Sequence, residues 1–109
     1  MRVINKHYSS RYALKRSVYI GRPTKWGNPY PMPREALRDE VCDKYELYMA
    51  TRLINGVVTQ DDFNELQGKD LQCFCAPKRC HGDTILLLYN MTEQERMEWA
   101  NAKISGVHS

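Results

Sequence analysis

Hydrophobic and polar residues follow two different periods along the chain, and these periods predict its main elements. Short runs rich in β-branched and aromatic residues, at positions 17–21 and 71–76, are typical of strands. A third such run, RVIN at positions 2–5, is expected to pair with the strand at 17–21. From residue 34 to about residue 54, apolar residues recur at steps of three and four, which predicts a long amphipathic helix that stops before Gly56.

Capping signals predict three more helices. Thr59 with Asp62 three residues later opens a short helix that ends before Gly68. A loop containing Pro77 leads into a helix over positions 83–89. Thr92 with Glu95 then forms a capping box at the start of a last helix.

This order of elements predicts an α/β fold: a small single-domain sandwich over residues 1–109, with a short, partly parallel sheet flanked by helices. In such sheets, ligands bind beyond the carboxyl ends of the strands. The loops at 21–31 and 76–83 each follow a predicted strand, so we expect them to converge on one site. Tyr45, Tyr48 and Tyr89 lie on helical faces, and we expect them in the core rather than at a dimer interface.

Composition narrows the class of protein. The chain is 42% hydrophobic and 27% charged, as in globular proteins, and no stretch approaches the ~20 apolar residues of a membrane span. The N-terminus lacks the apolar centre of a secretory signal. These features predict a cytoplasmic protein without membrane contact. In that reducing compartment, clustered cysteines are expected to be free, metal-bound or reactive rather than linked in disulfides.

Positive charge is concentrated near the N-terminus, although the net charge is only +3. The first 25 residues contain seven cations and no acid. This segment either faces an anion, such as a phosphate, a nucleotide or a nucleic acid, or is a solvated basic arm. The cations are Arg2, Lys6, Arg11, Lys15, Arg16, Arg22 and Lys25.

The first loop, GRPTKWGNPYP at positions 21–31, offers groups that could bind a phosphorylated ligand. Its prolines stiffen it, and its two glycines permit conformations closed to other residues. Arg22 and Lys25 suit an anion clamp, and Trp26 and Asn28 would flank the rest of the ligand. Alternatively, Trp26 fills the edge of the core and Asn28 holds the turn.

The second loop belongs to the segment CFCAPKRCHGD, which allows several kinds of chemistry. Thiolates and an imidazole are zinc ligands, so Cys73, Cys75, Cys80 and His81 form a candidate zinc site, although their spacing is unusual for one. Cys80 beside His81 at a helix start could instead be a nucleophile. His81 and Asp83 could instead bind ligand or act as acid–base groups, with no cysteine acting as a nucleophile. Otherwise the cysteines are small buried residues, and Cys42 has no role.

Taken together, the two loops resemble those of a phage and bacterial family called domain of unknown function 4326. That family pairs an R-P-x-K-W-G-N-P-[FY] segment with L-x-C-x-C-x-P-x-x-C-H-G-D, and both occur here in order. The matching positions are Arg22, Pro23, Lys25, Trp26, Gly27, Asn28, Pro29, Cys73, Cys75, Pro77, Cys80, His81, Gly82 and Asp83.

The resemblance implies a phage-type accessory protein that acts in the bacterial host cytoplasm. We expect both loops to build one polar pocket that binds a nucleotide or related phosphorylated ligand, and the sequence leaves open whether the ligand is also processed. The alternative is a non-enzymatic, zinc-stapled module that binds a host protein or a nucleic acid.

Overall fold

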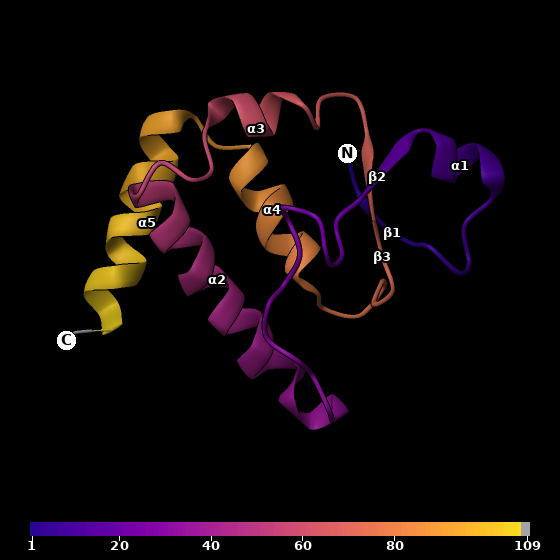
Figure 1. The fold of residues 1–109 in the computed structure, drawn as a ribbon, viewed down its shortest axis with the longest axis horizontal. Coiled ribbons are helices and arrows are strands. Elements are labelled where there is room, and N and C mark those ends of the chain that lie inside the picture. The colour runs from indigo at the N-terminus through magenta and orange to yellow at the C-terminus, as the bar shows by residue number, and fades with distance from the viewer. Residues whose placement is uncertain (108–109) are drawn as a thin grey trace.

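The fold was obtained as a computed structural model, which describes residues 1–107 (Figure 1). In this part of the chain, β1 (Val3–Asn5), β2 (Ser17–Tyr19) and β3 (Asp70–Cys73) form a parallel sheet in the order β1-β3-β2. The predicted α/β class is confirmed, and the sheet is parallel throughout.

The central position of β3 corrects one prediction. Residues 2–5 do not pair with residues 17–21, because β3 lies between the two strands, with Leu71 opposite both Val3 and Val18. Strands that follow each other in sequence pair most directly as an antiparallel hairpin, whereas β1 and β2 run parallel to each other and are joined by a crossover. The burial of β3 fits the centre of a sheet, since Leu71, Gln72 and Cys73 are all buried.

Six helical segments surround the sheet in the described range. Helices α2, α4 and α5 stand on one side of the strands, with α4 nearest to them, and α1 projects on the other side (Figure 1). The short α1 was not predicted, because it buries none of its residues and so has no apolar period. The segments are α1 (Arg11–Lys15), the 3-10 helix η1 (Glu35–Leu37), α2 (Arg38–Ile54), α3 (Gln60–Asn64), α4 (His81–Tyr89) and α5 (Glu93–Val107).

Side-chain caps start four of these helices: α1, where Ser10 Oγ accepts the backbone N–H of Ala13 at 3.1 Å, and α3, α4 and α5. The predicted capping boxes at Thr59 with Asp62 and at Thr92 with Glu95 are both present. The start of α4 differs from the prediction, because the helix begins at His81 rather than at residue 83, and its N-cap is Cys80. Asp83 is then the third helical residue, and its Oδ2 accepts the backbone N–H of Cys80 at 3.1 Å.

The core lies between the sheet and the three larger helices. Tyr45 is fully buried, and its hydroxyl donates to the backbone oxygen of Trp26 at 2.7 Å. Tyr48 and Tyr89 are partly buried and pack against the core, as expected. Across residues 1–107, the helices are too short or too polar to cross a bilayer.

Candidate functional site

A cavity of about 270 Å³ lies beyond the carboxyl ends of β2 and β3. Its wall includes Arg22 and Asn28 from the first loop, and Cys75 and His81 from the second loop and the start of α4. The structure therefore brings the two loops to one site, where α2 closes the side opposite the sheet with Arg38, Val41 and Cys42. Each loop contains one cis peptide bond, before Pro23 and before Pro77.

Arg22 is the cation of the first loop that faces the cavity. Its side chain is exposed and, among residues 1–107, forms no hydrogen bond or ion pair with another side chain. Cys80 lines the same cavity. Asn28 lies nearby, and its Oδ1 accepts the backbone N–H of Tyr30 at 2.9 Å, so that its amide N–H groups remain for a ligand.

Lys25 lies outside the cavity and faces α3. Its Nζ is 2.7 Å from Asp62 Oδ1 and 3.1 Å from Glu65 Oε2. These hydrogen bonds, the one with Asp62 above all, raise the pKa of Lys25. The lysine thus joins the first loop to α3, and the structure does not place it with Arg22 as a clamp.

Trp26 is a core residue, with only 3% of its surface exposed. Its ring packs on Phe63, with centroids 5.3 Å apart. Gly21 and Gly27 do not use the positive φ that glycine permits; among residues 1–107 that conformation occurs at Gly56 and Gly68. Close packing explains why position 27 is a glycine, since a Cβ there would lie 3.0 Å from the Cα and N of Arg22.

Two further arginines line the cavity, and carboxylates neutralise both. Arg38 binds Glu35 through two hydrogen bonds, of 2.7 and 2.9 Å, and also donates to the backbone oxygen of Arg79. Arg79 binds Asp43 at 2.9 Å and Asp39 at 3.1 Å. These contacts raise the pKa of both guanidinium groups, so they stay charged but have little free capacity for a ligand.

His81 presents a neutral imidazole to the cavity. Its Nε2 lies 2.8 Å from the backbone oxygen of Ile20, and since a carbonyl only accepts, Nε2 carries the proton. Burial lowers the pKa of His81, although the bond to Ile20 and the charge of Asp83 oppose that shift. Its Nδ1 is therefore a lone-pair acceptor near neutral pH. Asp83 itself serves as a cap and does not line the cavity.

All four cysteines of the chain line this one cavity. The Sγ atoms of Cys73 and Cys80 lie 3.3 Å apart. A hydrogen bond from Cys80, together with backbone N–H groups of Cys75 and Ala76, lowers the pKa of Cys73 to about 6, and the same contact with burial raises the pKa of Cys80. The pair is therefore asymmetric: the contact favours the anion on Cys73 and the thiol on Cys80.

The residues of the candidate zinc site share the cavity but not a common centre. The imidazole Nε2 of His81 is bound to Ile20, and Cys73 and Cys80 face each other. Within the described range 1–107, no group of three or more His, Cys, Asp or Glu side chains is arranged to hold a metal ion. Zinc binding stays a prediction, which metal analysis of the purified protein would test.

Several lining residues were not predicted from the sequence. They are the aromatic residues Tyr19, Tyr30 and Phe74, the arginines Arg38 and Arg79, and Cys42. Arg38 and Cys42 are four positions apart, which places them on one face of α2, but that spacing alone does not show what the face meets. Only the tertiary fold brings that face to the sheet end.

Comparison with known proteins gives a family but no solved structure. A family model described as "Domain of unknown function (DUF4326)" matches residues 4–91. An uncharacterized 12.4 kDa protein from the nrdA-td intergenic region of Enterobacteria phage T4 is 35% identical over 89 residues, which cover 82% of this chain and 77% of the relative. The uncharacterized protein R718 of Acanthamoeba polyphaga mimivirus is 29% identical over 98 residues, covering 71% of this chain and 69% of that protein. No solved structure matches the chain significantly.

Proposed function

Because this chain belongs to the DUF4326 family, whose matched region includes both loops, we propose that their shared cavity binds a nucleotide or a related phosphorylated ligand. The observation that carries the proposal is the unpaired guanidinium of Arg22 in the cavity wall. It is the cavity arginine that has no carboxylate partner among residues 1–107, whereas Arg38 and Arg79 are neutralised. A guanidinium in that state suits a phosphate group, which it can bind through two parallel hydrogen bonds.

The walls around Arg22 suit the base of a nucleotide. Tyr19, Tyr30 and Phe74 provide aromatic surface. Tyr30 is 37% exposed and Phe74 is 48% exposed. Bases stack on such rings with little dependence on their identity. The amide of Asn28 and Nδ1 of His81 add one donor group and one acceptor, which would orient the base or sugar.

Binding is the function that this geometry supports best. If the bound ligand is also hydrolysed or transferred, His81 is the group of the cavity that would accept the proton, since its Nδ1 is unprotonated near neutral pH. The relative from phage T4 supports placing this activity in the cytoplasm of an infected bacterium.

Calorimetric titration with a panel of nucleoside monophosphates, diphosphates and nucleotide sugars tests the proposal. We expect Arg22→Ala to weaken binding about tenfold to a hundredfold, because a charge-assisted bond to phosphate is lost. Lys25→Ala is the matched control from the same loop, and it should leave affinity within about twofold because Lys25 faces α3. Equal affinity of the Arg22 variant and the unchanged protein would refute the phosphate contact, and analysis of the ligand after incubation separates binding from turnover.

A further inference from the structure

The cavity is smaller than a complete site for a large free nucleotide. Its volume of about 270 Å³ lies just below the range of about 300–1,000 Å³ that is usual for small-molecule pockets. It would enclose one nucleoside-sized group and leave the atoms on either side of it outside. The surface next to the cavity therefore decides what kind of molecule the bound nucleotide belongs to.

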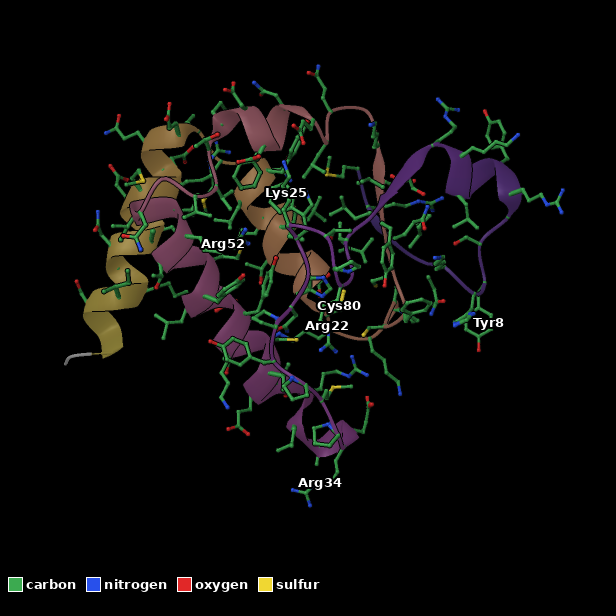
Figure 2. The ribbon with its side chains drawn as sticks, viewed as in Figure 1. Tyr8, Arg22, Lys25, Arg34, Arg52 and Cys80 are labelled. Carbon is green, nitrogen blue, oxygen red and sulfur yellow. The ribbon has the colours of Figure 1, made fainter. Side chains whose placement is uncertain are left out.

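A row of rings, here called the aromatic strip, connects the cavity with the surface beside α1. Tyr19 and Phe74 line the cavity, with ring centroids 5.9 Å apart. Phe74 lies 4.8 Å from His7, and His7 lies 6.5 Å from Tyr8. Tyr8, at the outer end, is 87% exposed and points away from the body of the protein (Figure 2).

Exposure of this kind is unusual for large aromatic residues of a monomeric protein. Nearby on α1, Tyr12 is also 70% exposed, and α1 itself buries no residue. Rings left open to water at a stability cost mark a contact surface more often than a folding requirement. The strip therefore offers a surface on which a partner can stack along successive rings.

Unpaired cations accompany the rings. Lys6 Nζ lies 4.6 Å from the centre of the Tyr19 ring and 5.8 Å from that of Phe74. The guanidinium of Arg16 lies 5.3 Å from the ring of Tyr12. Within the described residues, Lys6, Arg11, Lys15 and Arg16 form no ion pair. No acid occurs between residues 1 and 34, so this surface carries only positive charge from its own segment.

We infer that the protein binds single-stranded nucleic acid along the aromatic strip, with one nucleotide of the strand inserted into the cavity. Stacked aromatic rings beside a positively charged track are the features by which proteins hold single strands without reading their sequence. A free nucleotide would use the cavity but leave Tyr8, Tyr12 and the cations of α1 without a contact. The inference rests on the proposed function and specifies its substrate class.

The test compares a labelled oligothymidylate of about 12 nucleotides with thymidine monophosphate, by fluorescence anisotropy and calorimetry respectively. We expect the oligonucleotide to bind more tightly than the mononucleotide. Tyr8→Ala and Tyr12→Ala should each weaken oligonucleotide binding about fivefold or more and leave mononucleotide affinity unchanged. Arg11→Ala should reduce the slope of log affinity against log salt by about 0.7, the value for one lost phosphate contact with a single strand.

Two control variants keep the test specific. Arg34→Ala removes an exposed cation just before η1, apart from Tyr8 at the lower tip of the molecule in Figure 2, and it should leave the salt slope unchanged. Val57→Ala removes an exposed apolar side chain away from the strip, and it should not affect either ligand.

The outcomes separate this inference from the proposal on which it rests. Mononucleotide binding without tighter oligonucleotide binding overturns the inference and keeps the proposed function. Oligonucleotide binding that is insensitive to Tyr8→Ala and Tyr12→Ala also overturns the inference, because the strand would then follow another surface. If neither ligand binds, the inference fails, and the nucleotide panel decides the proposed function separately.

Discussion

Cys73 and Cys80 lie against each other in a buried part of the cavity wall. Each is at most 3% exposed, and their Sγ atoms are 3.3 Å apart. The S–H of Cys80 and two backbone N–H groups stabilise the thiolate of Cys73, whose pKa falls to about 6. Low-pKa thiols occur where hydrogen bonds or positive charge stabilise the anion, and they are the thiols that react or bind metals.

Replacing Cys80 should therefore change the titration of its neighbour. In Cys80→Ala the donor S–H is absent, so we expect the pKa of Cys73 to rise from about 6 toward its ordinary value. The ultraviolet absorbance of the thiolate, followed against pH, measures this. Cys42→Ala is the control and should keep the low transition. A transition that stays near 6 without Cys80 would show that the backbone groups alone hold the anion.

His81 should make the stability of the fold depend on pH. Its pKa is lowered by burial, so below about pH 6.5 the unfolded chain takes up a proton that the folded chain resists. Folding stability is then fully present above that pH and falls as the solution becomes more acidic. Urea unfolding at about pH 7.5 and about pH 5.5 should show a smaller loss for His81→Gln than for the unchanged protein. An equal loss in both would mean that other groups cause it.

At the scale of elements, the start of α4 packs closely on the sheet. Gly82, the second residue of α4, lies against the sheet side of the helix. A Cβ at this position would lie 2.9 Å from Ile20 Cδ1 and 3.0 Å from Val3 Cγ2. The absence of a side chain thus allows the cavity residues Cys80 and His81 to sit directly on the ends of the strands.

Gly82→Ala should destabilise the fold by about 1–3 kcal/mol, the usual effect of overpacking a filled interior. Urea unfolding measures the change. Gly106→Ala in α5 is the matched control, because a Cβ there has no described atom within 4 Å, and it should change stability by less than about 1 kcal/mol. If both variants unfolded alike, the close approach of α4 to the sheet would not be needed.

Local patterns were enough to predict most elements, and long-range pairing was not. The strand positions, the long helix and the caps at Thr59 and Thr92 depend on neighbouring residues and were found from the sequence. The place of β3 between β1 and β2 depends on contacts across nearly 70 positions and was missed. The same limit applies to the site. Arg22 and Asn28 were predicted to face the ligand and do line the cavity, but the pairing of Lys25 with Asp62 depends on where α3 packs.

At the scale of the whole molecule, the two sides of the sheet differ in how firmly they are held. Helices α2, α4 and α5 enclose a continuous core, whereas α1 on the other side buries nothing. Regions with few buried contacts open most often. Backbone amides of α1 should therefore exchange hydrogen much faster than those of β3, as measured by nuclear magnetic resonance or mass spectrometry. Slow exchange in α1 would point to a contact that covers it, such as self-association.

The strand order β1-β3-β2 also determines when the sheet can form while the chain is being synthesised. Both outer strands are synthesised within the first 19 residues, but the strand to which each pairs is not complete until residue 73. While the chain leaves the ribosome, the N-terminal segment has no sheet partner, and α2 and α3 emerge before it gains one. Helices of local sequence can form in that interval, whereas the sheet must wait for its centre, so its assembly is a late event in folding.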